Sequence, residues 1–210
     1  MAGISVLIMI LNNFEFWLMN NSIRRLIQRT VEVKKLVQIC NFPVGERVLE
    51  LGCGSGYGTK LIKKHFKPEK ISAIDLDERM IKIANKNNTD ANITFIVGDA
   101  TKLPFSNNTF DAVFELGIIH HIPNWRDSIK EIFRVLKPGG QIIIEDLSLE
   151  TFNSFIGKFL KRFFRHPYSK MYREQEFIDY LTKMRFERIK VKRNVYGAFF
   201  PAFILQATKR

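Results

Sequence analysis

One short segment constrains the fold of this chain more than any other: residues 48–58 read V-L-E-L-G-C-G-S-G-Y-G. An apolar run with a single acid inside it is typical of a buried strand, and the glycines after it predict a tight turn. Glycine adopts positive φ without strain and lets the backbone approach a ligand closely, while the amides that begin the next helix face that ligand. The segment predicts a strand, a turn and a helix that together bind a nucleotide-like cofactor.

Carboxylates recur at the ends of the apolar runs that follow. Asp75 ends the run I-S-A-I-D and lies 19 residues beyond Gly56, about the separation at which an acid on the second strand meets a ribose. Asp99 and Glu115 lie at the ends of the next two runs, and Glu50 lies within the first. Open α/β sheets bind ligands at the carboxyl edge of their strands, so these four acids predict a nucleoside site there.

With these motifs in this order, the chain resembles a class I S-adenosylmethionine-dependent methyltransferase of the broad small-molecule type. The match rests on V-L-E-L-G-C-G-S-G, A-I-D-L-D, V-G-D-A-T-K-L-P-F, F-D-A-V-F-E-L-G-I-I-H-H-I-P-N-W and R-V-L-K-P-G-G, within residues 47–146. The resemblance implies an α/β fold: a Rossmann-like, seven-stranded, mostly parallel sheet with an antiparallel C-terminal hairpin and helices on both faces. It also implies S-adenosylmethionine as cofactor, S-adenosylhomocysteine as product, and a small apolar or anionic acceptor, such as a lipid, a quinone-like compound or another metabolite.

The resemblance assigns roles to individual positions. Asp75 is expected to accept hydrogen bonds from both ribose hydroxyls, and Asp99 to bind the adenine amino group. The amide of Ala100 would face the adenine ring, which Leu76 and Met80 would flank. The glycine turn would carry the methionine portion of the cofactor. The full set of expected cofactor-binding residues is Glu50, Gly52, Cys53, Gly54, Asp75, Leu76, Met80, Asp99, Ala100, Glu115 and Leu116.

His120 and His121 are the candidate catalytic residues, as a general base or as elements that shape the site. Because they are adjacent, their side chains point in different directions, and no metal site is expected from them.

The two cysteines lack a paired spacing, so neither a disulfide nor a thiolate metal site is expected. Trp125, Phe155 and Phe159 are candidate substrate contacts, although a tryptophan or phenylalanine in such a pattern also suits the core.

Three other functions share part of this pattern. A nicotinamide-dinucleotide oxidoreductase has the same strand, glycines and ribose acid, but its turn reads G-x-G-x-x-G, whereas this chain has G-x-G-x-G. An RNA-directed methyltransferase suits the pI of about 9.8, although E-L-G-I replaces the N/D-P-P-Y type of motif that accompanies methylation of base amines. A non-catalytic cofactor-binding module is the third alternative.

The positive charge lies outside the predicted cofactor core. Of the net charge of +12, residues 45–149 contribute nothing, because they hold 14 Lys and Arg against 14 Asp and Glu. Residues 1–44 contribute +3 and residues 150–210 contribute +9. Basic flanks are typical of proteins that bind an anionic partner, either a membrane or a nucleic acid, and the sequence leaves open a third alternative, in which these charges are only solvated.

A basic amphipathic helix is predicted over residues 150–165, E-T-F-N-S-F-I-G-K-F-L-K-R-F-F-R, and His166-Pro167 would end it. Such a helix packs on the core, lines an apolar acceptor pocket or attaches to an anionic membrane. Residues 136–140, L-K-P-G-G, predict a turn before the fifth strand. Residues 173–184 predict the last helix, and residues 188–196 and 198–209 predict the final strand pair.

Length and composition predict a single domain over residues 1–210, with 46% hydrophobic and 26% charged residues. We expect an N-terminal cap helix (1–44), a cofactor-binding core (45–149), a substrate-side insertion (150–173), and a last helix with a strand hairpin (174–210). The apolar opening A-G-I-S-V-L-I-M-I-L lacks a basic leader and is about half a membrane span. We therefore expect no signal peptide and a cytoplasmic protein, in which this segment either packs on the fold as a cap or lies at a membrane surface. The sequence leaves open the acceptor, its nucleophilic atom and the oligomeric state.

Overall fold

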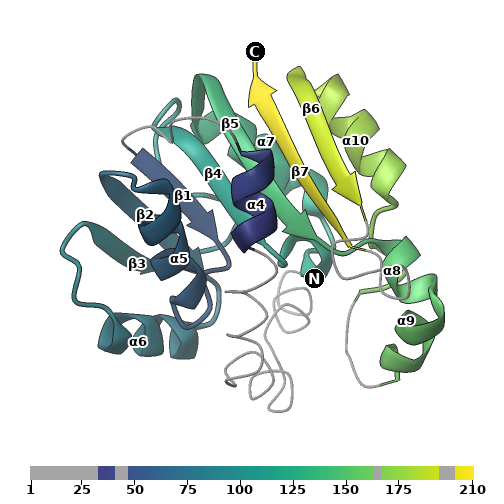
Figure 1. The fold of residues 1–210 in the computed structure, drawn as a ribbon, viewed down its shortest axis with the longest axis horizontal. Coiled ribbons are helices and arrows are strands. Elements are labelled where there is room, and N and C mark those ends of the chain that lie inside the picture. The colour runs from purple at the N-terminus through teal and green to yellow at the C-terminus, as the bar shows by residue number, and fades with distance from the viewer. Residues whose placement is uncertain (1–32, 41–46, 163–166, 194–201) are drawn as a thin grey trace.

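The computed structural model describes residues 33–40, 47–162, 167–193 and 202–210 (Figure 1). The strands are β1 (Arg47–Leu51), β2 (Lys70–Asp75), β3 (Ile93–Val97), β4 (Phe110–Leu116), β5 (Leu136–Asp146), β6 (Phe186–Arg193) and β7 (Phe203–Lys209). The helices are α4 (Val33–Ile39), α5 (Tyr57–Phe66), α6 (Glu78–Asn87), α7 (Trp125–Val135), α8 (Leu149–Asn153), α9 (Phe155–Leu160) and α10 (Glu174–Lys183), with a 3-10 turn, η2 (Ile119–His121).

The seven described strands form one sheet in the order β3-β2-β1-β4-β5-β7-β6. Strands β1 to β5 pair in parallel, whereas β7 runs antiparallel to both β5 and β6. This confirms the predicted mostly parallel sheet with an antiparallel C-terminal hairpin. The strand order reverses between β1 and β4, and open α/β sheets bind their ligands beside such a reversal, at the carboxyl ends of the strands.

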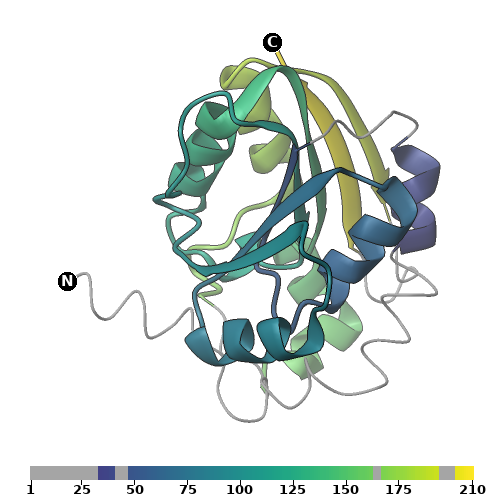
Figure 2. The same ribbon diagram turned by 90° about the vertical axis from the view of Figure 1, so that its left-hand side faces the viewer.

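Helices cover both faces of the sheet, as the resemblance implies (Figure 2). Alternate residues of each strand face opposite sides. On one side, Leu49 and Ile142 belong to the core that includes residues of α7 and α10. On the other, Val48 and Ile143 belong to the core that includes residues of α4, α5 and α6. The two apolar layers fix the strand register and hence the positions of the carboxyl ends.

The segment L-K-P-G-G, expected as a turn before the fifth strand, lies inside β5. Leu136 pairs with Phe110, and Gln141 pairs with Ala112, so the intervening residues of β5 form a bulge against β4. Gly139, at a φ of 77°, provides the left-handed position within it. The prediction of a turn was wrong because pairing with β4 begins before the glycines instead of after them.

The single helix predicted over residues 150–165 was also wrong, because α8 and α9 are separate helices that meet at Ser154. The Ser154 hydroxyl accepts a hydrogen bond from the amide of Gly157 (3.1 Å) and donates one to the carbonyl of Thr151 (2.6 Å). Serine at this position caps a new helix in place of continuing the old one. The expected break at His166-Pro167 and residues 163–165 lie at or beyond the edge of the described residues.

The remaining predicted elements differ mainly at their boundaries. Helix α10 falls inside the predicted span 173–184, β6 begins two residues earlier than predicted, and β7 begins at Phe203. Most of the predicted N-terminal cap helix lies outside the described residues, of which α4 is the first element. Within the described ranges, no helix has both the length and the apolarity needed to cross a membrane.

Candidate functional site

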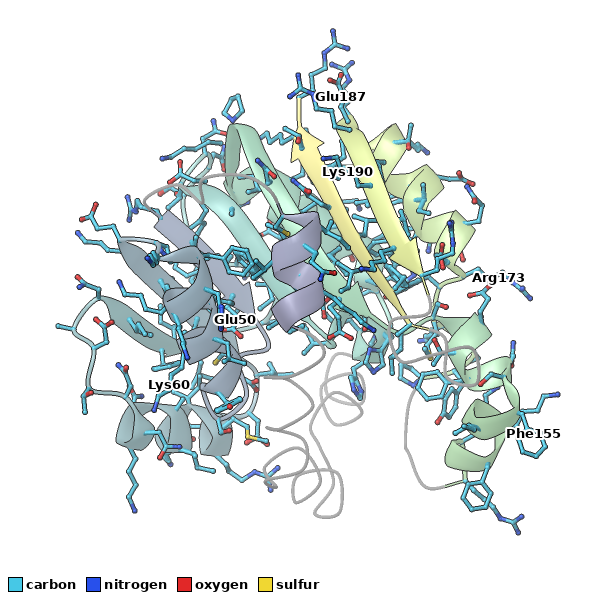
Figure 3. All side chains as sticks on the ribbon, viewed as in Figure 1. Glu50, Lys60, Phe155, Arg173, Glu187 and Lys190 are labelled. Carbon is cyan, nitrogen blue, oxygen red and sulfur yellow. The ribbon has the colours of Figure 1, made fainter. Side chains whose placement is uncertain are left out.

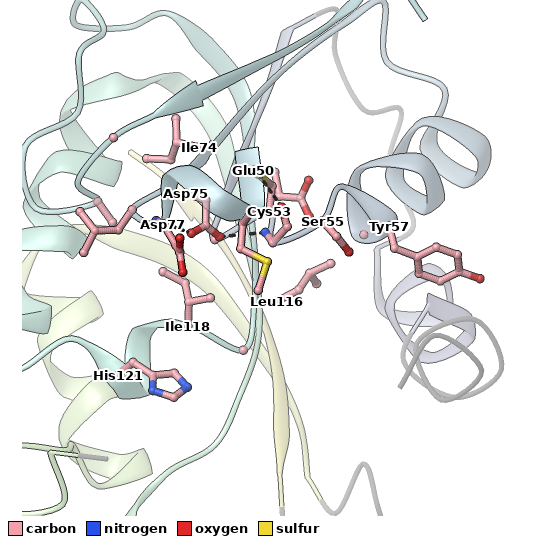
Figure 4. A pocket seen from close by; sticks show the side chains of 18 of the residues that line it. Glu50, Cys53, Ser55, Tyr57, Ile74, Asp75, Asp77, Leu116, Ile118 and His121 are labelled. Carbon is pink, nitrogen blue, oxygen red and sulfur yellow. Dashed lines mark hydrogen bonds between the residues drawn. The ribbon is translucent and has the colours of Figure 1, made fainter. Parts of the chain in front are cut away.

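A pocket lies at the carboxyl ends of β1, β2 and β4, where the strand order reverses (Figure 4). Its lining residues are Glu50, Gly52, Cys53, Gly54, Ser55, Tyr57, Gly58, Ile74, Asp75, Leu76, Asp77, Met80, Gly98, Ala100, Leu116, Gly117, Ile118, His121 and Ile122. The cavity is therefore mostly apolar, with a few acidic groups and one histidine.

The glycine turn after β1 is shaped by two different demands. Gly52 has a φ of 68°, and a Cβ there would lie 2.1 Å from the Cγ2 of Ile118, so glycine is required both by conformation and by close packing. Gly54 has a φ of 52°, but a Cβ there would meet no atom within 4 Å. The backbone at Gly54 therefore borders open space, which is the arrangement expected of a turn that passes close to a ligand.

Asp75 is fixed by main-chain amides at the centre of this pocket. Its Oδ2 accepts a hydrogen bond from the amide of Gly54 (2.8 Å), and its Oδ1 accepts one from the amide of Asp77 (2.8 Å). Burial raises the pKa of Asp75 despite these two hydrogen bonds. A carboxylate oxygen has room for a second hydrogen bond. Asp75 is thus oriented before any ligand binds and retains acceptor capacity toward the cavity.

Glu50 forms a second, more deeply buried acidic group of the wall. Its side chain accepts a hydrogen bond from the hydroxyl of Thr59, and a Cβ on Gly58 would lie 2.6 Å from its Oε1. Burial raises the pKa of Glu50 to about 7, an increase that the Thr59 hydrogen bond opposes. Near neutral pH, a cationic group in the pocket would therefore favour the ionised form of Glu50.

The two histidines after β4 occupy different environments. His121 lines the pocket, whereas His120 is buried and its ring lies against that of His121, with 4.1 Å between ring centroids and 37° between ring planes. Asp146, at the end of β5, accepts hydrogen bonds from the Nδ1 and the main-chain amide of His120, the latter at 3.0 Å. The hydroxyl of Tyr172 donates to the same carboxylate. A buried network thus extends from the pocket wall to the segment that precedes α10.

Two further contacts support this network from its edges. Glu115 accepts hydrogen bonds from the amides of Ile118 and Ile119 and so holds the turn η2 that carries both histidines. Burial, and secondly the nearby carboxylate of Asp146, raise the pKa of Glu115. The amide of Leu149 donates to the carbonyl of Tyr172 (3.1 Å). The start of α8 and the residues before α10 are therefore joined beside Asp146.

This arrangement of pocket, turn and acid has counterparts among known proteins. Residues 49–144 match the family model described as a methyltransferase domain. These residues, 96 of the 210 in the chain, are therefore similar to a methyltransferase domain.

Relatives of this part of the chain include enzymes named for apolar acceptors. A fatty-acid O-methyltransferase of Mycolicibacterium smegmatis is 36% identical over 102 residues, 49% of this chain and 37% of the relative. A chloroplastic 2-methyl-6-phytyl-1,4-hydroquinone methyltransferase 2 of Oryza sativa is 32% identical over 147 residues, 70% of this chain and 40% of the relative. The match thus spans less than half the length of either relative.

The same fold occurs in solved structures of similar size. A crystal structure of an S-adenosylmethionine-dependent methyltransferase from Mesorhizobium loti superposes with a TM-score of 0.67 at 17% identity, covering 83% of this chain and 96% of that one. At this level of identity the likeness concerns the fold alone.

Most of the expected cofactor-binding positions of the methyltransferase domain line the pocket. Nine of the eleven do so, and the two outside the lining are Asp99 and Glu115. The Asp99 carboxylate accepts from the amide and hydroxyl of Thr101, both at 2.8 Å. Asp99 therefore shapes the turn that presents Ala100 to the pocket.

The three expected substrate contacts lie away from the described pocket. Trp125 is 2% exposed and packs against Tyr172, at 5.3 Å between ring centroids, within the core. Phe155 and Phe159 are on α9 and are 87% and 64% exposed. Burial of Trp125 leaves almost none of its surface for a substrate. Trp125 therefore stabilises the fold.

Several lining residues were missed from the sequence. Asp77 lines the pocket, caps α6 through a hydrogen bond from the amide of Arg79 (2.9 Å), and has a pKa lowered chiefly by that arginine side chain. Its place in the motif A-I-D-L-D was the available signal. For Ile118 and Ile122 the sequence contained no signal, because their roles depend on how η2 folds over the glycine turn.

Over the described ranges, no group of three or more His, Cys, Asp or Glu side chains is placed to hold a metal ion.

Proposed function

We propose that this protein transfers a methyl group from S-adenosylmethionine to a small apolar acceptor, such as a lipid or a quinone-like compound. The observation that carries the proposal is the fixed Asp75 carboxylate beside the open backbone of Gly54, at the reversal of strand order. The names of the two relatives support the acceptor class, since one acts on a fatty acid and the other on a phytyl hydroquinone.

The residues of the pocket fit this cofactor. The Asp75 oxygens would accept hydrogen bonds from ribose hydroxyls, and Leu76, Ile74 and Met80 would provide an apolar slot for adenine. Glu50 would face the cationic end of the cofactor, where ionisation of its carboxyl group becomes favourable. When bound, S-adenosylmethionine supplies a methyl group on a sulfonium sulfur that is already activated for in-line displacement.

The wall near His121 suits an apolar acceptor. Ile118 and Ile122 flank His121 in the chain, line the pocket with it and would exclude water from the reacting group. Alignment of two reactants in a fixed pocket contributes on the order of 7 to 11 kcal/mol at best. Positioning by these side chains would thus provide most of the rate acceleration.

We assign proton removal from the acceptor to His121, and a positioning role to His120. Asp146 accepts a hydrogen bond from the Nδ1 of His120, which fixes the tautomer and the orientation of the ring that lies against His121. General-base catalysis by a positioned side chain contributes about 10²- to 10⁴-fold. His121→Ala should therefore lower kcat by at least about 10²-fold while the affinity for S-adenosylhomocysteine is unchanged.

The pH profile separates catalysis from structure. In the native protein the rate should rise with pH across the range in which histidines titrate, and this rise should disappear in His121→Ala. Asp146→Asn should displace the rise along the pH axis, which a merely structural role would not do. Full activity of His121→Ala on an identified acceptor would remove the histidine from the mechanism.

The function itself is tested with methyl-labelled cofactor and three acceptor pools: dispersed long-chain fatty acids, prenylated hydroquinones and RNA. Label in an organic-extractable product, dependent on Asp75, is the expected result. Label in RNA alone would favour the RNA-directed alternative. Tight binding of a nicotinamide dinucleotide without binding of S-adenosylhomocysteine would make the protein an oxidoreductase.

A further inference from the structure

We propose that α9 binds the surface of an anionic lipid membrane and holds the pocket's edge of the sheet against it. The contact is made by one face of the helix and its extension, which we call the α9 face: Phe155, Lys158, Phe159 and Arg162. These positions follow the spacing i, i+3, i+4, i+7 of a single helical stripe. The inference rests on the proposed function only for the source of the acceptor, because membrane binding is measurable without methyl transfer.

The packing of α9 on α8 determines which side chains face outward. Gly157 is buried, and a Cβ there would lie 2.0 Å from the carbonyl oxygen of Thr151. Its backbone therefore rests directly on α8. Phe155 and Phe159 lie two residues before and two residues after Gly157, so helical geometry places them on the opposite side. Any larger residue at position 157 would separate the two helices.

Apolar exposure is concentrated on this helix. The described residues include five exposed large hydrophobic side chains, and three of them, Phe155, Ile156 and Phe159, are on α9. Phe155 is 87% exposed and Phe159 is 64% exposed. Figure 3 shows Phe155 projecting from α9 away from the body of the protein. Neighbouring exposed phenylalanines are typical of an interaction surface and are unusual on a helix that only faces water.

The charge around α9 has one sign. Residues 151–173 contain six Lys and Arg and no Asp or Glu. Lys158 and Arg162 are exposed on the same face as the phenylalanines, and among the described residues neither forms an ion pair. An interfacial segment that binds anionic lipid combines these two properties, because aromatic rings enter the headgroup region while cations remain with the phosphates. The charge complementarity thus favours an anionic bilayer as the partner.

The location of α9 connects the membrane to the site. Helices α8 and α9 follow the carboxyl end of β5, which is parallel to β1 and β4 and so ends at the same edge of the sheet as the pocket. Figure 1 shows α9 beyond this edge, at the lower right of the view. A membrane that contacts the α9 face would therefore lie on the pocket's side of the molecule, where an apolar acceptor is drawn from the bilayer.

The test is co-sedimentation of the full chain with phosphatidylglycerol-containing vesicles and with pure phosphatidylcholine vesicles, at low and high salt. The native protein should bind the anionic vesicles more tightly, and high salt should weaken this binding. Lys158→Gln with Arg162→Gln should weaken it about 30-fold. Phe155→Ser with Phe159→Ser should weaken it by more than about tenfold, even at low salt.

Matched controls change similar residues elsewhere. Val37→Ser with Val97→Ser removes two other exposed apolar side chains, and Lys70→Gln with Lys183→Gln removes two other exposed cations. Both control proteins should bind vesicles within about twofold of the native protein, since their charges and apolar groups lie off the α9 face. Affinity for S-adenosylhomocysteine, measured for every variant, verifies that each is folded.

Equal binding to both vesicle types, or anionic binding that the α9 variants leave unchanged, would overturn the inference. Salt-sensitive RNA binding that requires Lys158 and Arg162, without vesicle binding, would assign the surface to nucleic acid instead. Methyl transfer to a detergent-dispersed acceptor is measured in parallel. Its persistence alongside failed vesicle binding would refute this inference alone, whereas its absence with every acceptor would refute the proposed function.

Discussion

The two sides of the pocket are held together by different kinds of hydrogen bond. On the β1–β2 side, main-chain amides of Gly54 and Asp77 orient Asp75. On the β4–β5 side, the side chain of Asp146 joins His120 and Tyr172, which are each 26 residues away in opposite directions along the chain. Asp75 is thus held by main-chain amides, whereas Asp146 bonds the main-chain amide of His120 and also joins two buried side chains to each other. A site built in this way can keep one ligand while its other half changes.

The largest effect that would sharpen this contrast is expected for Asp146→Ala. Asp146 is fully buried, and its removal would leave the donors of His120 and Tyr172 without their acceptor. We expect a loss of about 3 to 5 kcal/mol in the free energy of unfolding, measured by urea denaturation. Tyr172→Phe, which removes a single donor, should lose about 1 to 3 kcal/mol.

The control for this experiment is Glu78→Ala, because Glu78 pairs with Lys82 on the exposed surface of α6. That change should alter the free energy of unfolding by no more than about 0.5 kcal/mol. If Asp146→Ala is no more destabilising than this control, the side-chain network does not hold the β4–β5 side, and the proposed difference between the two sides of the pocket is wrong.

The next effect concerns pH and Glu50. The pKa of Glu50 is raised to about 7 in the folded protein, so the folded state retains a proton that the unfolded state releases above pH 4.5. The free energy of unfolding should therefore fall as pH rises from about 4.5 to 7, by about 3 kcal/mol in total, and then level off. Glu50→Gln should lack this component.

The measurement is the difference in unfolding free energy between Glu50→Gln and the native protein, at pH 5 and at pH 8. The variant should gain relative to the native protein at pH 8. If the difference were the same at both pH values, burial would not raise the pKa of Glu50 in the folded protein.

A smaller effect should distinguish ligand binding from stability on that same side. Asp75→Ala should weaken binding of S-adenosylhomocysteine by about 1.5 to 3 kcal/mol, because charge-assisted hydrogen bonds to the ribose are lost. Isothermal titration calorimetry measures this change, with Asp127→Ala on α7 as the control. Unchanged affinity in Asp75→Ala would place the ribose elsewhere in the pocket.

The smallest effect is expected at the junction between α8 and α9. Ser154→Ala removes the cap hydrogen bond to the amide of Gly157 and should cost about 1 kcal/mol. Hydrogen exchange should quicken over residues 155–160 while exchange in β1 and β4 is unchanged. If Ser154→Ala also made exchange faster throughout the sheet, α9 would unfold together with the sheet and not as a separate unit.

Much of the sheet could be predicted because most of its strands have a clear signal in the local sequence. Strands β1 to β4 are short apolar runs that end near an acid or a glycine, and their helices follow directly. The bulge in β5 could not be predicted, since K-P-G-G favours a turn and only pairing with β4 keeps it in the strand. The division at Ser154 was hidden for a similar reason: apolar spacing continues through it, and packing of Gly157 on α8 interrupts the helix.

The site divides in the same way. The glycine turn and Asp75 could be predicted because their geometry depends on residues close in sequence or at a regular separation. The network of Asp146 and Tyr172 could not, because it forms only when the segment before α10 returns to the end of β5. An acid at the end of a fifth strand was a usable signal for Asp146, whereas nothing in the sequence distinguished Tyr172.

The contacts of Tyr172 have a consequence for how this protein can diverge. Its carbonyl accepts a hydrogen bond from the amide of Leu149 (3.1 Å), and its hydroxyl donates to Asp146, so Leu149 and Tyr172 are joined beside the end of β5. The entropic cost of lengthening a closed excursion grows only slowly with its length. A substitution or an insertion between Leu149 and Tyr172 should therefore leave the hydrogen bonds of the pocket, such as those of Asp75, in place.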